Sequence, residues 1–348
     1  MKAAIIIVIA IIGAILVLIQ RNQAPVKWSI GEVIRTPDSA FDKLEDYPFK
    51  ANYIDSLGYR IHYLDEGPRD GEVILLLHGQ PSWSYLYRHM IPLLSNAGYR
   101  VIAPDNVGFG KSDKPISLDA HNYQMHIDVM SNLMDKLDLQ NINLFAQDWG
   151  GLIGLRVVAE RPDRFARIML SNTALPATGG IKGWLAYPLF KLGVWREGTV
   201  ETISPEKGEF RFTQWVAYAK TTPTFDFKTL FQRATSRELS EKELAGYSAP
   251  YPNNDYIAGV RKFPTMVASQ LRQNDEVMRT FYQQWDKPLL TAFGSDDTLM
   301  AGRDKVWQET VPGAKQQTHT IIEGGAHFIQ EDKPEKLVEL LINFIQKN

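Results

Sequence analysis

Cysteine is absent from all 348 residues of the chain. This absence excludes disulfide bonds, thiol nucleophiles and cysteine-ligated metal sites together. The seven histidines show none of the spacings of metal-binding motifs such as H-E-x-x-H. The sequence therefore gives no indication of a metal site.

A strong net charge is also absent, because the chain contains 38 lysine and arginine residues and 40 aspartate and glutamate residues. A chain so close to neutrality has no positive field that would attract nucleic acid, and it has no acidic tail. We expect its partner to be a small, weakly charged molecule rather than a nucleic acid.

Long apolar runs are absent except at the N-terminus, where residues 3–19 contain only Ala, Ile, Val, Leu and one Gly. This length lies at the short end of the range of about 17–25 residues that spans a membrane. No small-residue cleavage site of the A-x-A kind follows the run. The sequence predicts a hydrophobic helix in residues 1–22 that tethers the protein to a membrane, with a removed signal segment as the alternative. The expected location is the membrane or the periplasm, with the cytoplasm as the alternative.

The rest of the chain alternates between short apolar stretches and stretches of helical spacing. Ala51–Ser56 and Tyr59–Leu64 alternate in polarity around Leu57-Gly58, which is typical of an antiparallel hairpin at a sheet edge. The strand–loop–helix order that follows predicts an α/β fold with a mostly parallel sheet flanked by helices. The strands expected after the hairpin are Val73–Leu77, Arg100–Ala103, Ile142–Phe145, Arg167–Leu170, Pro288–Phe293 and Thr318–Ile322. The helices expected with them are Tyr85–Asn96, Tyr123–Leu137, Leu152–Arg161 and Lys333–Gln346.

This alternation stops in the middle of the chain, in a segment rich in aromatic residues, proline and helical fragments. We interpret this segment as a helical cap inserted between two strands of one sheet. The predicted organisation is an N-terminal anchor or signal segment at 1–22, core parts at 23–174 and 286–348, and a helical cap at 175–285.

The run Ala146–Gly151 carries an aspartate at the turn between a predicted strand and a predicted helix. Hydrolases of the G-x-S-x-G type place their serine nucleophile at this turn. Asp148 differs from a serine because a carboxyl group with a reference pKa of about 3.9 is already an anion at neutral pH. It can attack carbon without a base. In isolation the same pattern is more typical of an acidic helix N-cap, and the motifs elsewhere in the chain reverse this preference.

A base and an orienting acid follow in the chain order that this architecture uses. His327 lies in a glycine-rich loop after the last predicted strand. Asp296 and Asp297 follow the preceding strand and are both candidates for the acid, while the other aspartate could cap a helix that starts near Thr298. Ser171–Ala174, after the strand before that, offers no carboxylate.

The turn His78–Pro81 directly follows a predicted strand, at the position that donates to the oxyanion hole in such folds. We predict the backbone N–H groups of Gln80 and Trp149 as the oxyanion donors. The Gln80 side chain is expected near Trp149 or the hydrolytic water, and His78 is expected to be structural. The remaining histidines are expected to have no catalytic role: His62, His89, His121, His126 and His319.

From about Tyr47 to the C-terminus, the chain resembles the haloalkane dehalogenases of the α/β-hydrolase superfamily. The matching motifs are His78–Trp83, Gln147–Gly151, Gly294 with Asp297, Gly325–Phe328, Phe212–Trp215 and Gly259–Pro264. The resemblance implies an eight-stranded sheet and favours Asp297 over Asp296 as the acid. It also implies that the indole N–H groups of Trp149 and Trp215 bind the halide, as in the branch that draws its second tryptophan from the cap.

By this resemblance the substrates are a halogenated aliphatic compound and water, and the products are an alcohol, a halide ion and a proton. Asp148 displaces the halide and forms an alkyl ester, which a water activated by His327 then hydrolyses. An indole N–H suits a leaving halide because it donates without being able to accept. The reaction requires no cofactor.

Three other functions are alternatives to haloalkane dehalogenation. An epoxide hydrolase shares the aspartate elbow but uses cap tyrosines, although Gln147 and Trp215 favour dehalogenation. The candidate tyrosines are Tyr187, Tyr218, Tyr247, Tyr251 and Tyr256. A fluoroacetate dehalogenase needs an arginine pair where this chain has Asn106–Lys111. A non-catalytic binding protein is the third alternative, against which the complete set of nucleophile, acid and base argues.

Overall fold

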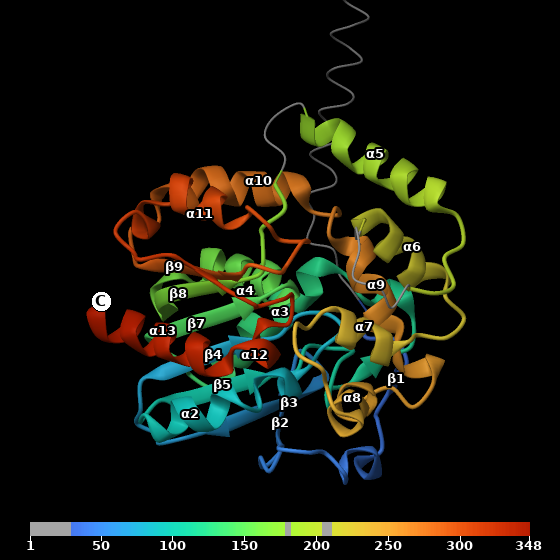
Figure 1. Ribbon diagram of the computed structural model, residues 1–348, viewed down its shortest axis with the longest axis horizontal. Helices are drawn as coiled ribbons and strands as arrows, with labels where there is room; N and C mark the ends of the chain where they lie inside the picture. Colours follow the sequence, from blue (N-terminus) through green and yellow to red (C-terminus); the bar gives the residue numbers. More distant parts are fainter. Residues whose placement is uncertain (1–28, 178–181, 204–210) are drawn as a thin grey trace, which may run out of the picture.

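The computed structural model describes residues 29–177, 182–203 and 211–348, with the backbone alone at 182–184 (Figure 1). The apolar segment predicted at residues 3–19 lies outside these ranges. Within them, no helix combines the length and the apolar character needed to cross a membrane.

An eight-stranded sheet forms the centre of the molecule, in the order β10-β9-β8-β7-β4-β5-β3-β2. Only the pairs β2–β3 and β3–β5 are antiparallel. The central strands β4, β7 and β9 are buried at every residue, as expected for parallel strands with helices on both faces. The strands are β2 Asn52–Ser56, β3 Tyr59–Glu66, β4 Val73–Leu77, β5 Arg100–Pro104, β7 Ile142–Gln147, β8 Phe165–Ser171, β9 Leu289–Gly294 and β10 Thr320–Ile322.

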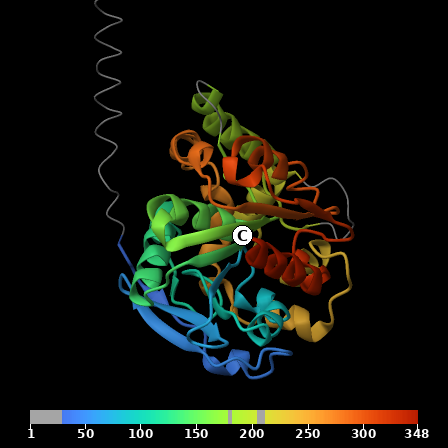
Figure 2. The same ribbon diagram turned by 90° about the vertical axis from the view of Figure 1, so that its left-hand side faces the viewer.

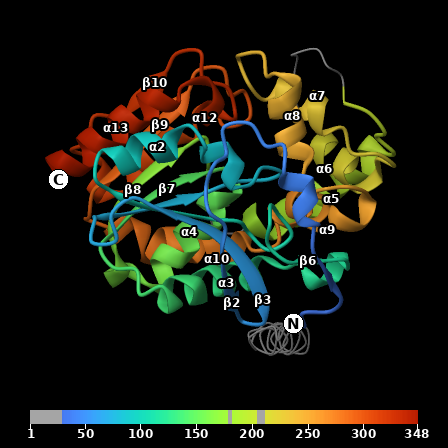
Figure 3. The same cartoon turned by 90° about the horizontal axis from the view of Figure 1, so that it is seen from below.

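Helices cover both faces of this sheet. Figure 3 shows α2 (Met90–Asn96), α12 (Ile329–Asp332) and α13 (Pro334–Lys347) on one side. The opposite side carries α3 (Tyr123–Lys136), α4 (Trp149–Glu160) and α10 (Leu271–Thr280). Figure 2 shows the twisted sheet between these two layers of helices. The predicted α/β-hydrolase architecture is therefore confirmed.

In the described residues between β8 and β9, where the cap was predicted, the chain forms six α-helices. They are α5 Lys182–Glu197, α6 Phe212–Thr221, α7 Phe227–Arg233, α8 Glu241–Ser248, α9 Ala258–Met266 and α10. Helices α6 to α9 gather at one end of the sheet (Figure 1). By contrast, α10 packs on the core, where Arg156 of α4 donates to the Asn274 side chain at 3.1 Å.

Two helix predictions were wrong in detail. The single helix expected at 85–96 is a 3₁₀ turn, η2 Ser84–Tyr87, followed by α2 from Met90. Pro92 lacks an N–H group and fits only the first turn of a helix, so the α-helix begins just before it. The helix expected near Thr298 is absent, and α11 begins at Asp304 instead.

Residues 29–50 run over the surface of the core and reach the cap. β1 (Val33–Ile34) pairs with β6 (Lys114–Pro115) in a two-stranded ribbon that the sequence pattern did not predict. The Thr36 hydroxyl donates to the carbonyl of Pro250 at 2.6 Å. The chain before β2 therefore helps to hold the cap in place.

Candidate active site

Asp148 occupies a strained turn between β7 and α4. Its φ of 49° and ψ of −126° lie outside the regions that non-glycine residues usually adopt. The neighbouring Gly150 is required by packing, because a Cβ atom there would lie 1.9 Å from the carbonyl oxygen of Leu77. The close approach of α4 to β4 thus fixes Asp148 at the carboxyl end of the sheet.

The structure brings Asp148, His327 and Asp297 together, as predicted from the chain order. His327 Nδ1 donates to Asp297 Oδ2 at 2.8 Å, and His327 Nε2 lies 3.5 Å from Asp148 Oδ2. Asp297 is buried, and Asp148 is 9% exposed. The imidazole therefore lies between two carboxylates, one of which faces the space where a substrate can enter.

Asp297, not Asp296, is the residue against His327. The second oxygen of Asp297 accepts the backbone N–H groups of Leu299 and Met300, at 2.9 and 3.2 Å, which fixes the turn after β9. Asp296 instead accepts a hydrogen bond from the Ser236 hydroxyl in the cap at 2.9 Å. The expectation that the other aspartate caps a helix was wrong, because Asp297 itself accepts the N–H groups of the turn.

The Gln80 N–H, the first predicted oxyanion donor, donates to Asp148 Oδ1 at 2.7 Å. Gly79 makes room for this contact, because a Cβ there would lie 2.3 Å from the same oxygen. The role of the Trp149 N–H stays a prediction. The Gln80 side chain donates to the carbonyl of Val260 in α9, at 3.0 Å.

A cavity of about 310 Å³ opens beside these residues, between core and cap. Trp149 and Trp215 both line it together with Asp148 and His327. Most of the remaining lining is apolar, from residues such as Leu152, Phe212, Leu230 and Val267. Among the described residues around it, none of the five candidate cap tyrosines lines this cavity. The space suits a small apolar molecule better than a charged one.

Comparison with known proteins decides the family. Residues 72–334 match the family model of the alpha/beta hydrolase fold. A haloalkane dehalogenase of Psychrobacter cryohalolentis is 43% identical, over 91% of this chain and 99% of the relative. One from Mycolicibacterium paratuberculosis is 40% identical, over 90% and 98%. The chain belongs to the haloalkane dehalogenases.

The dehalogenase fold is shared with the tetrameric structure of haloalkane dehalogenase DpaA from Paraglaciecola agarilytica. The TM-score is 0.74 at 30% identity, over 91% of this chain and 99% of that one. The chain is thus a hydrolase that acts on carbon–halogen bonds, in agreement with the resemblance of its motifs.

In the free dehalogenase, His327 is held in its protonated form. Burial opposes the charge, but the carboxylates of Asp297 and Asp148 outweigh burial and raise the pKa of His327 to about 10. At neutral pH the resting site therefore contains an imidazolium between two carboxylates.

Asn172 is a site residue that the sequence analysis missed. Its Nδ2 donates to the carbonyls of Ala326 and His327, at 2.7 and 3.1 Å, and its Oδ1 accepts the Gly294 N–H at 2.8 Å. Gln147 also donates to the His327 carbonyl, at 3.0 Å. The signal in the sequence is a polar residue directly after a parallel strand, at the edge of the sheet where sites of α/β folds lie.

His78 and His62 of the dehalogenase have structural contacts. His78 Nε2 accepts the Asn106 N–H at 3.0 Å, consistent with its expected structural role. His62 Nδ1 lies 2.7 Å from Asp105 Oδ2, and both side chains are fully buried. Burial alone would raise the pKa of Asp105, but His62 and other donors hold it well below its usual value.

Proposed function

We propose that Asp148 is the nucleophile of a two-step hydrolysis. In the first step one oxygen of Asp148 bonds to the carbon of the substrate, and the carbon–halogen bond breaks with its electron pair on the halide. In the second step a water attacks the carbonyl carbon of the resulting ester, and His327 Nε2 takes one proton of that water. The bond between the carbonyl carbon and the alkoxide oxygen then breaks with its electron pair on that oxygen. The alkoxide takes the second proton of the attacking water and leaves as the alcohol, and Asp148 is restored as a carboxylate. The observation that supports this most strongly is the carboxylate at the elbow, 3.5 Å from the imidazole.

The proton balance supports the order of the steps. Esterification removes the negative charge of Asp148, which is one of the two charges that raise the pKa of His327. The pKa then falls, and the imidazolium loses its proton to solvent. The neutral imidazole, still bound to Asp297, is the base for the second step.

We propose that the Gln80 N–H binds the developing oxyanion. In the resting site it already donates to Asp148 Oδ1, the oxygen that stays on the side chain as the ester carbonyl if Oδ2 attacks. Donors that are in place before the reaction need no reorganisation in the transition state. The Trp149 N–H is the proposed second donor.

We propose Trp149 and Trp215 as the halide-binding pair, because both line the cavity together with Asp148, Trp149 from α4 of the core and Trp215 from α6 of the cap. Asp297 is the proposed acid, and its contact with Nδ1 supports that role.

Trp215→Phe is expected to weaken halide binding by roughly 10-fold or more, because one hydrogen bond to a charged ligand is lost. Iodide quenching of tryptophan fluorescence measures the affinity. Trp285→Phe is the matched control, because Trp285 is also buried but does not line the cavity. Equal iodide affinities in the two variants would remove Trp215 from the halide site.

The reaction class is tested with two substrates. Wild-type protein is expected to release halide and a proton from 1,2-dibromoethane and to leave styrene oxide unchanged, because no candidate tyrosine lines the described cavity to activate an epoxide oxygen. Halide titration and diol detection measure the two reactions. Diol formation without halide release would favour the epoxide hydrolase alternative.

We also propose the division into core parts at 23–174 and 286–348 and a cap at 175–285. The membrane tether at residues 3–19, with a membrane or periplasmic location, is proposed from the apolar sequence alone. Recovery of the full-length chain, with Met1 present, entirely in the soluble fraction of cells would contradict the tether and favour the cytoplasm.

A further inference from the structure

The loop that carries His327 is bound directly to a short segment of the cap, residues 234–237. The Phe328 N–H donates to the Ala234 carbonyl at 2.9 Å. The Phe328 ring also stacks on Phe231 of α7, with 4.8 Å between ring centroids. The residue after the proposed base is therefore fixed to the cap.

Asp332 makes the corresponding contact for the residue before the base. Its Oδ2 accepts the Ala326 N–H at 2.8 Å, while its Oδ1 accepts the N–H groups of Ser236 and Arg237 at 2.8 and 3.0 Å. One carboxylate thus joins the loop of His327 to the cap through three backbone groups. Hydrogen bonds to an ionised acceptor are stronger than neutral ones.

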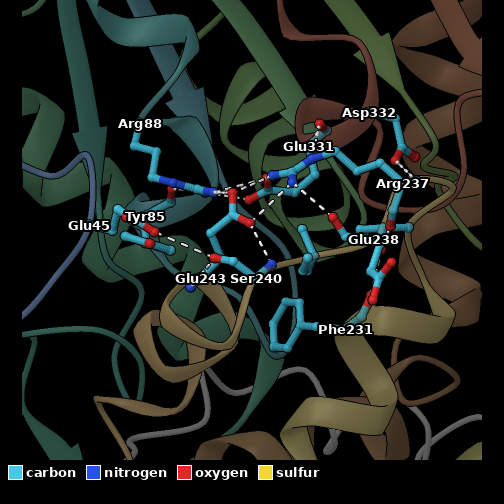
Figure 4. A network of polar contacts seen from close by, with 12 residues as sticks. Glu45, Tyr85, Arg88, Phe231, Arg237, Glu238, Ser240, Glu243, Glu331 and Asp332 are labelled. Carbon is cyan, nitrogen blue, oxygen red and sulfur yellow. Dashed lines mark hydrogen bonds and ion pairs between the residues drawn. The ribbon is translucent and has the colours of Figure 1, made fainter.

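The neighbouring Glu331 fixes the same junction with buried charges (Figure 4). Its side chain is completely buried and forms ion pairs with Arg88 of the core and Arg237 of the cap. Tyr247 of α8 donates to it, and Glu243 pairs with both arginines. Arg88 and Glu331 are fully buried, whereas Arg237 is partly exposed. Removing one partner of a buried ion pair leaves an uncompensated charge and is strongly destabilising, so these pairs hold the cap against the core.

A metal-binding interpretation of this cluster does not hold. Ligand atoms of His89, Glu243 and Glu331 lie within 4.8 Å of one another. Both carboxylates already face guanidinium groups, which would repel a cation. The cluster is an ion-pair network between core and cap.

The backbone around His327 is consequently held from two directions. On the core side, Asn172 and Gln147 bind the His327 carbonyl. On the cap side, Asp332 binds the Ala326 N–H. The imidazole has to place Nε2 where a water can reach the ester carbonyl, and displacement by about 1 Å can cost up to 100-fold in rate.

We propose that Asp332 is a positioning residue for His327, which acts in ester hydrolysis by fixing the loop of the base to the cap. This inference depends on the proposed role of His327 as the base of the second step. Asp332 itself does not line the cavity. Attack by Asp148 does not use the imidazole as a base, so Asp332 matters for the second step only.

The test separates the two steps by rapid mixing of enzyme with 1,2-dibromoethane. Asp332→Asn replaces one acceptor oxygen with an amide donor that faces a backbone N–H. We expect the rate constant of the halide burst to stay within about twofold, while ester hydrolysis slows by about 10-fold to 100-fold. The burst amplitude should rise toward one halide per site.

Ser236→Ala is the matched control, because it removes a side-chain contact of the same junction but leaves the Ser236 N–H for Asp332. Both steps should remain within about twofold of wild type. Asp332→Ser, which keeps one acceptor oxygen and makes room for water, is the second variant if Asp332→Asn does not fold; its hydrolysis step should slow in the same way.

Equal slowing of both steps in a folded Asp332 variant would mean a general structural role and would overturn the proposal, as would unchanged hydrolysis. Measuring His327→Gln in the same experiment distinguishes failure of the proposed two-step function from failure of the positioning role of Asp332. If that variant gives no burst, the proposed two-step function fails. If it gives the burst while folded Asp332 variants hydrolyse the ester normally, only the positioning role fails.

Discussion

His327→Gln should release one equivalent of halide per active site and then stop. Attack by Asp148 needs the carboxylate and the halide donors, all of which remain, whereas hydrolysis of the ester needs a base at Nε2. Loss of a general base lowers turnover by about 10²-fold to 10⁴-fold. Rapid-mixing halide assays measure the burst, and mass spectrometry of the peptide containing residue 148 detects the trapped ester.

His319→Gln is the control for this substitution. His319 is partly buried and does not line the cavity. Its Nδ1 accepts the backbone N–H of Thr291, a residue of the strand that precedes Asp297. The His319→Gln variant should hydrolyse the substrate at the rate of the wild-type protein. Full turnover by His327→Gln would show that the imidazole is not the base of the second step. A folded variant that gives neither burst nor ester would contradict the two-step scheme itself.

Asp148→Asn should abolish halide release even in a single turnover. An amide oxygen is a poor nucleophile, so the loss of turnover is on the order of 10⁶-fold, as for removal of a nucleophile from a hydrolase triad. Asparagine is preferred to alanine because it tolerates the positive φ of this turn. The measurement is halide released per site with enzyme in excess.

Asp163→Asn, at an exposed position away from the cavity, is the matched control and should be fully active. The mass of the peptide containing residue 148 shows whether the asparagine has deamidated back to aspartate. Rapid halide release by intact Asp148→Asn would mean that another group attacks the carbon.

The sequence predicted that the three proposed triad residues lie together, because parallel strands bring their carboxyl ends to one edge of the sheet. Asp148, Asp297 and His327 each follow such a strand, so their proximity did not depend on loop details. The choice between Asp296 and Asp297 did depend on them. It is set by the turn in which Asp297 accepts two backbone N–H groups, and adjacent aspartates carry no sequence signal for that turn.

The junction between cap and core could not be predicted from the sequence. Arg88 and Glu331 are 243 positions apart, and charged residues are usually exposed. Only the folded chain reveals that both are buried and paired. Trp215 poses the same problem, because its place in the cavity follows from how α6 packs against α5 and α9 within the cap. The family resemblance identified Trp215, whereas the residue's own surroundings in the sequence did not.

Labelling with heavy oxygen tests the central claim most directly. A single turnover with excess enzyme in water enriched in the heavy oxygen isotope should place the label in the side chain of Asp148 and leave the alcohol unlabelled, because the alcohol oxygen comes from the aspartate. Label in the alcohol, with none in residue 148, would show direct attack by water and contradict the covalent mechanism.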